Sequence, residues 1–302
     1  MQYLQWIIKG LAMGAADVVP GVSGGTLAFI LGVYERLLAA ISSCNLLALK
    51  LLSRLQLAAF WRHIDGTFLL CLFGGVLVSI FSLAGVLTYM LEYRPIPLWA
   101  LFCALILTAL PPLLRSVRWS LWRLLLCAVG IAFALIIGML TPRQLEPQSW
   151  MFFVAGAIAI CAMILPGISG SFLLLVMGQY ERILDAVSER DFLIIALFGS
   201  GCVVGLLSFS RLISWLLKHY HAVTIGVLSG FMLGSLNKIW PWKEVIETRI
   251  NSHGETVPFL EKSILPQNFQ GDPQILTAII MVICGFMLIF GLEKIANRLG
   301  KK

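Results

Sequence analysis

Long apolar runs with almost no charged residues are the feature that most limits how this chain can fold. Three runs cover residues 67–91, 97–114 and 122–140, and three more cover 192–217, 222–240 and 274–291. A helix needs about 20 apolar residues to cross the hydrocarbon core of a bilayer. Only 12% of all residues are charged, against about 25% in soluble domains. The sequence therefore predicts an all-α polytopic membrane protein.

A segment near the N-terminus returns in the middle of the chain. Residues 16–41 align without a gap with residues 162–187, and twelve of the 26 positions are identical. Chance would give roughly 2 or 3 identities in so apolar a composition, so a duplicated unit is indicated. Both copies contain Pro-Gly, then Ser-Gly, then Tyr-Glu-Arg. We expect two repeats, residues 1–145 and 146–302.

The Pro-Gly pairs, Pro20-Gly21 and Pro166-Gly167, predict a break in the helix of each repeat. Proline removes a backbone donor, and a break survives at membrane depth only where protein or a cavity surrounds it. The apolar stretches on either side are each too short to cross. We therefore expect re-entrant helical hairpins at residues 3–41 and 150–187. The alternative is two ordinary pairs of proline-kinked helices.

Three crossings between the hairpins would invert the second hairpin relative to the first. The predicted architecture is an inverted-topology repeat, in which each unit is a re-entrant hairpin followed by about three transmembrane helices. Residues 46–63 are expected to form an amphipathic helix on the membrane interface, or a simple linker. Residues 241–273 are expected to form a polar external loop.

The charges support one orientation. The net charge is +7, and this arrangement puts most basic residues on one side, which the positive-inside rule makes cytoplasmic, with both termini. The opposite loop, from Lys243 to Pro273, carries five acidic and three basic residues. This distribution at the ends of apolar runs argues against nucleic-acid binding.

Each Pro-Gly break precedes a half-helix whose first amides lack intrahelical partners. Such a terminus attracts anions, above all phosphate. The candidate phosphate-binding residues at the two breaks are Ser23, Gly24, Gly25 and Thr26, and Ser169, Gly170 and Ser171. The alternative is that the serines are simple N-caps and the glycines serve helix packing.

Arg36 and Arg182 follow Glu35 and Glu181 at the far end of each predicted half-helix. An arginine in an apolar setting is a functional candidate, because its planar guanidinium can hold a phosphate. A Glu-Arg ion pair that fixes the hairpin is an equal alternative. Asp17 precedes the first break and is a candidate proton carrier or helix cap, but Met163 replaces it in the second repeat.

The paired motifs, ADVVPGVSGGT with GVYERLL and LPGISGS with GQYERIL, resemble the signature of the polyprenyl-phosphate transporter family. The resemblance covers most of the chain and rests on Pro20, Gly21, Ser23, Gly24, Glu35, Arg36 and their counterparts in the second repeat. It implies a flippase in the bacterial cytoplasmic (inner) membrane. The flippase would return undecaprenyl phosphate, the carrier lipid of cell-envelope synthesis, from the outer to the inner leaflet. The resemblance implies no cofactor. Because Met163 stands in the second repeat where Asp17 stands in the first, the two repeats cannot both use an acid at this position.

The driving force and two other functions stay open at this stage. No P-loop is present, so ATP is not expected to drive transport. Moving a negative charge inward costs about 2.3 kcal/mol per 100 mV, so coupling to inward protons or sodium is a hypothesis, with Asp17, Glu35 and Glu181 as candidates. An ion-coupled carrier of a small soluble anion is the first alternative. A lipid diphosphate phosphatase is the second, but no catalytic residues or metal ligands with suitable spacing are found.

Overall fold

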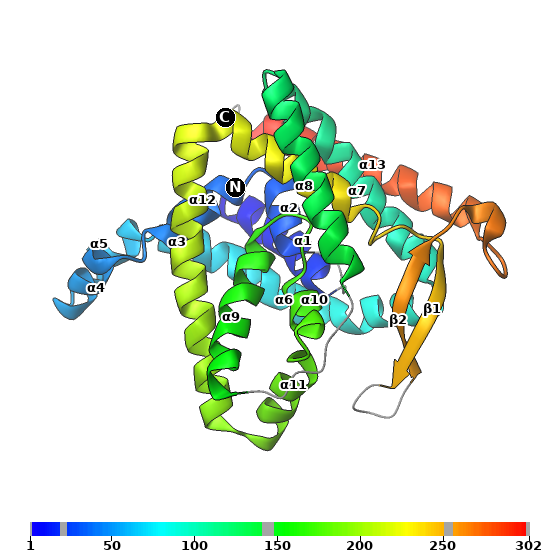
Figure 1. Cartoon of the computed structure of the whole chain (residues 1–302). Coiled ribbons are helices and arrows are strands. Elements are labelled where there is room, and N and C mark those ends of the chain that lie inside the picture. The colour runs from blue at the N-terminus through cyan, green and yellow to red at the C-terminus, as the bar shows by residue number, and fades with distance from the viewer. Residues whose placement is uncertain (1, 19–22, 141–147, 251–255, 300–302) are drawn as a thin grey trace.

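The structure is a computed structural model that describes residues 2–18, 23–140, 148–250 and 256–299. Helices make up most of it (Figure 1). The described residues up to 140 form α1 (Gln2–Val18), α2 (Gly24–Ile30), α3 (Tyr34–Ser42), α4 (Leu46–Ser53), α5 (Leu57–His63), α6 (Gly66–Tyr93), α7 (Pro95–Ser116) and α8 (Leu121–Met139). Those from 148 onward form α9 (Ser149–Ile164), α10 (Gly170–Val176), α11 (Tyr180–Glu189), α12 (Phe192–Ser235), β1 (Lys243–Ile250), β2 (Thr256–Ser263), a 3-10 turn (Pro266–Asn268) and α13 (Ile275–Leu299).

Several of these helices can cross a membrane. Within the described residues, α6, α7, α8 and α12 are long and apolar enough, and the bent pair α2 and α3 adds a fifth candidate span. The sequence predicted two separate crossings within 192–240. In the structure α12 consists of two helices that join across a kink at Tyr220, where the backbone leaves the helical region, and this kink lies between the two predicted runs. The chain is a multi-pass helical membrane protein.

Each hairpin consists of a long helix and two short ones. The sequence predicted a single half-helix from each Pro-Gly break to the Tyr-Glu-Arg motif. Instead, α2 and α10 end early, and the chain turns by 117° between α2 and α3. Gly32 and Gly178 make these turns with φ of +67° and +66°, a conformation that suits glycine. Arg36 and Arg182 therefore lie in the first turn of α3 and of α11, not at the far end of a half-helix.

Close helix packing holds each hairpin to the body. Helix α1 packs along α6, and α9 packs along the first part of α12. A Cβ at Gly10 would collide with the carbonyl oxygen of Leu72, and one at Gly201 would collide with that of Phe153. Small residues at both contacts let the backbones approach closely, as is common in membranes. Helix α7 packs on α13, and α8 packs on α12.

Two features project from opposite sides of the helical body (Figure 1). One is the pair α4 and α5, which occupies the predicted amphipathic segment as two helices because Leu55 adopts a φ of +54° between them. The other is the antiparallel hairpin of β1 and β2, which pairs Lys243 with Ser263 and Ile250 with Thr256. This hairpin lies in the predicted external loop, where no strand was expected.

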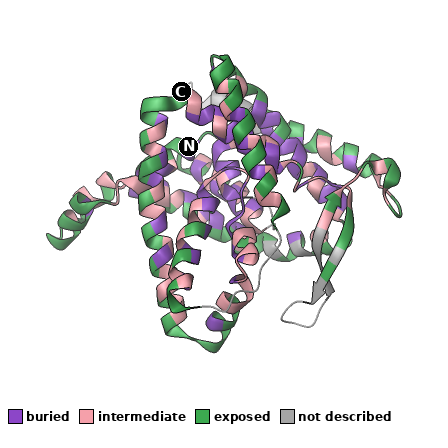
Figure 2. Ribbon diagram, viewed as in Figure 1, coloured by how far each residue is buried: buried purple, intermediate pink, exposed green. Residues whose placement is uncertain are grey.

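Most buried residues gather where α1, α2, α3, α6, α7 and α12 meet, and the outer helix faces are exposed (Figure 2). Phe68, Leu72, Leu228 and Met232 are fully buried in this core. Large apolar side chains such as Phe81 point outward instead. An exposed apolar surface of this extent is what lipid-facing helices present.

Candidate functional site

The turn of the first hairpin is closed by its own side chains. Ser23 caps α2, and its hydroxyl oxygen accepts a hydrogen bond from the Gly25 amide at 3.1 Å. Asp17 Oδ1 accepts one from the Gly24 amide at 2.6 Å. The Thr26 amide donates to the Ser23 carbonyl at 2.9 Å. The first amides of α2 therefore already hold acceptors, and a carboxylate occupies the place that a bound anion would take.

The two turns contact each other directly. The Ser23 hydroxyl donates to the carbonyl oxygen of Met163 at 2.9 Å, and the Gly167 amide donates to the Thr26 hydroxyl at 2.8 Å. A Cβ at Gly25 would lie 2.6 Å from the Met163 carbonyl oxygen, so only glycine allows this approach. Residues that are about 140 positions apart thus form one buried junction, as the sequence led us to expect of paired breaks. Pro20 and Gly21 lie outside the described residues.

The turn of the second hairpin is also buried, but it has fewer hydrogen bonds of its own. Pro166 is fully buried, and Gly167 adopts a φ of +85°. Ser169 caps α10, with its hydroxyl 3.4 Å from the Phe172 amide and 2.9 Å from the Ser171 hydroxyl. In the described part of the chain, the Gly170 amide has no hydrogen-bond acceptor. Met163, at the position of Asp17, supplies no carboxylate here.

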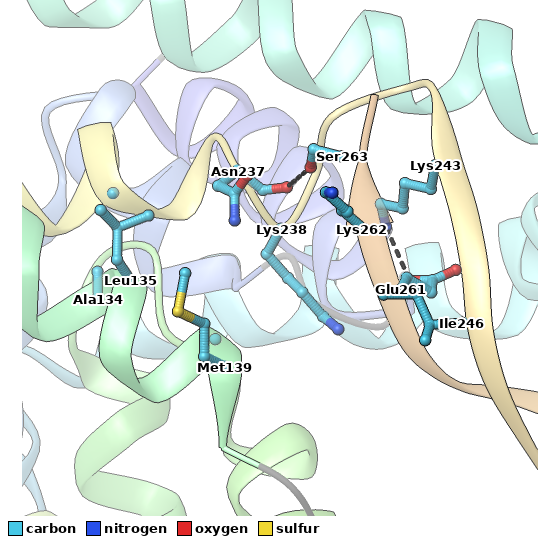
Figure 3. A pocket seen from close by; sticks show the side chains of 12 residues that line it. Ala134, Leu135, Met139, Asn237, Lys238, Lys243, Ile246, Glu261, Lys262 and Ser263 are labelled. Carbon is cyan, nitrogen blue, oxygen red and sulfur yellow. Dashed lines mark hydrogen bonds and ion pairs between the residues drawn. The ribbon is translucent and has the colours of Figure 1, made fainter. Parts of the chain in front are cut away.

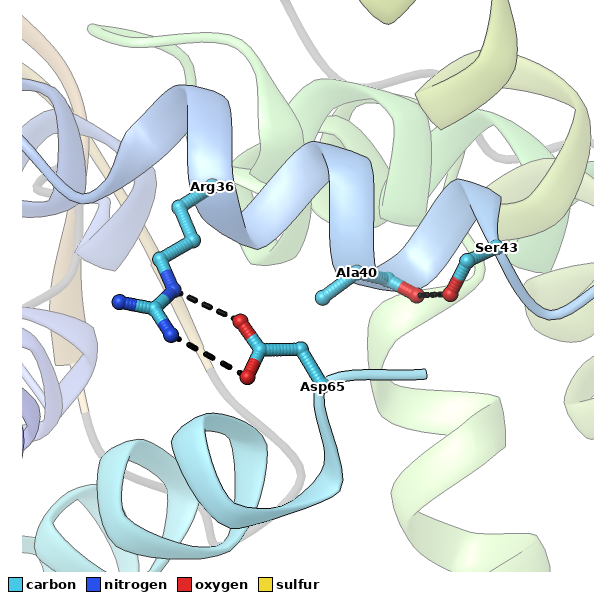
Figure 4. A network of polar contacts seen from close by, with 4 residues as sticks. All are labelled: Arg36, Ala40, Ser43 and Asp65. Atoms are coloured by element: carbon cyan, nitrogen blue, oxygen red, sulfur yellow. Dashed lines mark hydrogen bonds and ion pairs between the residues drawn. The ribbon is translucent and has the colours of Figure 1, made fainter. Parts of the chain in front are cut away.

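The two arginines have different surroundings. Arg36 donates from Nε and Nη2 to the carboxylate of Asp65, at 2.7 and 3.2 Å (Figure 4). Its guanidinium also lies over the rings of Trp6 and Phe68, at 4.3 and 4.6 Å from their centroids. Arg182 is half-buried, and its Nη1 is buried without a hydrogen-bond acceptor among the described residues. Arg36 is thus held by protein groups, whereas one donor of Arg182 has no acceptor among the described residues.

The acidic candidates are also dispersed. Glu35 is exposed and lies 3.0 Å from Nε2 of His221, so it pairs with α12 and not with the adjacent arginine. Glu181 is half-buried in the first turn of α11. Only Asp17 reaches a hairpin turn. Among the described residues, no three histidine, cysteine or acidic side chains gather as a metal site, and the seven cysteines are free thiols.

Two residues of this region were missed from the sequence. Asp65, the partner of Arg36, stands alone before an apolar run, and that isolation was the available signal. Lys238 interrupts the last part of the run 222–240, and in the structure its ammonium lies 4.7 Å from the ring centroid of Phe172, in the first turn of α10. Neither Asp65 nor Lys238 could be singled out without knowing how distant helices pack together.

A multi-pass helical protein with two helix breaks joined in its core has the architecture of a membrane carrier. Residues 13–257 match a protein family described as undecaprenyl phosphate translocase-like, and the chain belongs to this family. It is 48% identical over 303 residues to the polyprenyl-phosphate transporter of Vibrio cholerae, covering 99% of this chain and 98% of that one. It is 34% identical over 262 residues to the polyprenyl-phosphate transporter of Staphylococcus aureus, covering 80% and 88%. No solved structure matches.

Proposed function

We propose that the protein is a flippase that moves undecaprenyl phosphate from the outer to the inner leaflet of the bacterial cytoplasmic membrane. The observation that carries the proposal is the second hairpin turn. There the buried Ser169 hydroxyl and the acceptor-free Gly170 amide lie in the core of the helical bundle. Hydroxyl and amide donors at a helix terminus are suited to a phosphate. The names of both relatives supply the lipid to which this phosphate belongs.

An inverted repeat is part of the proposal, and the packing supports it. The first helix of each hairpin packs on the next long helix, as α1 does on α6 and α9 on α12. The later helices exchange partners across the repeats, as α7 does with α13 and α8 with α12. An exchange of this kind is expected of two units related by a pseudo-two-fold axis.

The orientation follows from the charge distribution. The pair α4 and α5 carries Lys50, Arg54 and Arg62, whereas β1 and β2 belong to the acidic loop. The positive-inside rule places α4 and α5, with both termini, in the cytoplasm. The β-hairpin then faces outward, at the leaflet from which the lipid is collected.

Coupling to an ion gradient completes the mechanism. A phosphate that enters a negative interior opposes the membrane potential by about 2.3 kcal/mol per charge and 100 mV. An inward proton or sodium ion offsets this cost. Asp17 is the best placed of the three candidate carboxylates because it bonds to the hairpin turn itself, whereas Glu35 is exposed and Glu181 belongs to α11.

The test is transbilayer movement of undecaprenyl phosphate in proteoliposomes, compared with empty vesicles. We expect the protein to accelerate movement, Ser169→Ala and Arg182→Ala to slow it at least about tenfold, and the exposed Ser188→Ala and Arg62→Ala to match the unmodified protein. Folded protein that moves no lipid would refute the proposal.

The same vesicles separate the other functions. A short-chain prenyl phosphate should compete with undecaprenyl phosphate, and inorganic phosphate should not. The opposite pattern would indicate a carrier of small soluble anions. Release of inorganic phosphate from undecaprenyl diphosphate by the purified protein would indicate a phosphatase and contradict transport without chemistry.

A further inference from the structure

A cavity of about 270 Å³ lies between α8, the end of α12 and the β-hairpin (Figure 3). Three lysines line it, Lys238, Lys243 and Lys262, together with one acidic residue, Glu261. Lys243 Nζ lies 3.2 Å from Glu261 Oε2, so this pair neutralises itself. The lining keeps an excess of two positive charges, which favours a doubly negative ligand.

Of the three lysines, Lys238 is the one whose ammonium lies beside Phe172 of α10, in the second helical hairpin. It is half-buried, and within the described residues no carboxylate lies within ion-pair distance of its ammonium. Burial lowers the pKa of Lys238, Lys243 lowers it further, and Glu261 raises it. A cation that is withdrawn from water without a bonded anion is unfavourable. This position is therefore stabilised when an anion enters.

A narrow neck connects Lys238 with the second hairpin turn. The neck is a small space of about 20 Å³, and Ser169, Gly167 and Phe172 line it. Lys238, Ala134 and Gly138 line both the neck and the larger cavity. The neck has room for about one water molecule, so a phosphate must widen it to enter. A phosphate that does so would meet the Lys238 ammonium on one side and the Ser169 hydroxyl on the other.

An apolar groove of about 350 Å³ continues from the neck between α8, α9, α10 and α12. Ile137 and Ile168 line both spaces. Phe133, Val154 and Ile158 are among the apolar side chains along the groove, and all three are exposed. A hydrocarbon chain in the groove would cover this surface.

We infer that the cavity, the neck and the groove form one binding track for a single-chain lipid phosphate, with the phosphate between Lys238 and Ser169 and the prenyl chain in the groove. This inference rests on the proposed function and places its substrate in the second repeat. A phosphate monoester carries close to two negative charges and matches the excess of the lining. A free phosphate would satisfy Lys238 but would make no use of the apolar groove, whereas a lipid phosphate would place its single prenyl chain in a groove that is continuous with the neck.

The first experiment is direct binding by the full-length protein in detergent, with farnesyl phosphate, farnesol and inorganic phosphate as probes. Lys238→Ala should weaken farnesyl phosphate binding at least about tenfold, because a charged hydrogen-bond donor is lost, and should leave farnesol binding unchanged. Lys238→Arg keeps the charge and should bind within about threefold of the unmodified protein. Lys218→Ala removes an exposed lysine of α12, the helix that precedes Lys238, and serves as the matched control.

A second pair of variants tests the groove. Val154→Trp fills it and should weaken farnesyl phosphate and farnesol alike by about tenfold. Val129→Trp adds the same bulk on an exposed face of α8 outside the groove and should bind both as the unmodified protein does. Gel filtration and thermal melting of every variant exclude misfolding as the cause.

The outcomes distinguish this inference from the proposed function. Unchanged farnesyl phosphate affinity in folded Lys238→Ala or Val154→Trp overturns the track. Inorganic phosphate that binds as tightly as farnesyl phosphate overturns the lipid as its ligand. If the unmodified protein binds farnesyl phosphate through Lys238 but moves no lipid in vesicles, the track stands and the proposed function fails. If the lipid moves equally fast in Lys238→Ala vesicles, the proposed function stands and the track fails.

Discussion

The turns of the two hairpins have similar sequences but differ in their hydrogen bonds. In the first, the Asp17 carboxylate accepts from the Gly24 amide, and Arg36 is paired with Asp65. In the second, Met163 replaces the acid, and Arg182 retains a buried donor without an acceptor among the described residues. The first turn thus contains a carboxylate that the second lacks. Two turns with similar sequences therefore differ in the polar groups that remain unpaired among the described residues.

Blocking the backbone of the second turn should have the largest effect. Gly167→Ala would strain a φ of +85° and place a Cβ 2.7 Å from the carbonyl oxygen of Phe231. We expect a loss of about 2–4 kcal/mol of stability and no lipid movement, measured by thermal denaturation and by the vesicle assay. Gly199→Ala is the control, since nothing lies within 4 Å of its added Cβ. An unchanged melting temperature for Gly167→Ala would contradict the close approach.

Giving the second turn the acid of the first should remove the difference between them. The Met163 side chain begins 3.6 Å from the position of a Cβ at Gly170, so Met163→Asp would bring a carboxylate to this terminus. We expect about tenfold weaker binding of farnesyl phosphate, because the new charge competes with the phosphate. Met163→Asn, of equal size and without charge, should have a much smaller effect. Equal affinities of the two variants for farnesyl phosphate would show that a carboxylate at this position does not distinguish the two turns.

Neutralising the acid of the first turn should have a moderate effect. Asp17→Asn removes the charge that faces the first amides of α2, and we expect a loss of about 1 kcal/mol of stability. Under the coupling hypothesis, lipid movement should also stop responding to an imposed proton gradient. Thermal denaturation and gradient-driven vesicle transport measure the two effects. The exposed Glu244→Gln is the control, and a full gradient response in Asp17→Asn would exclude this carboxylate as the proton carrier.

Breaking the ion pair of the first hairpin should have the smallest effect. The side chains of Arg36 and Asp65 are 40% and 37% exposed, and pairs of this kind contribute about 0.2–1 kcal/mol. We expect Asp65→Asn to lower stability within that range, because Arg36 remains packed on Trp6 and Phe68. Thermal denaturation at low and high salt checks this, since screening should reduce the difference. A loss of several kcal/mol would show that the pair organises the hairpin.

The sequence predicted the features that depend on local chemistry. The apolar runs located α6, α7 and α8, and the Pro-Gly motifs located the junction of the two turns. The early ends of α2 and α10 could have been suspected from Gly32 and Gly178. However, a glycine in an apolar helix is as often a packing residue as a turn.

The features that depend on distant partners could not be predicted. Asp65 reaches Arg36 because α6 begins beside α3, and His221 reaches Glu35 because α12 breaks at Tyr220. The cavity lined by Lys238, Lys243 and Lys262 could not be predicted because it forms only where β1 and β2 fold beside α8 and the end of α12. Short polar strands in a loop of mixed charge give a weak pattern, and tertiary contacts decide whether they form.

The two hydrogen bonds between the hairpin turns also affect the conformational equilibrium of the protein. Any motion that separates the turns breaks the bond from Ser23 to Met163 and the bond from Gly167 to Thr26. At about 1 kcal/mol each, they lower the population of a separated arrangement roughly thirtyfold. The two bonds therefore favour the arrangement in which the turns are in contact, and a ligand that offered replacement bonds to these groups would reduce this preference.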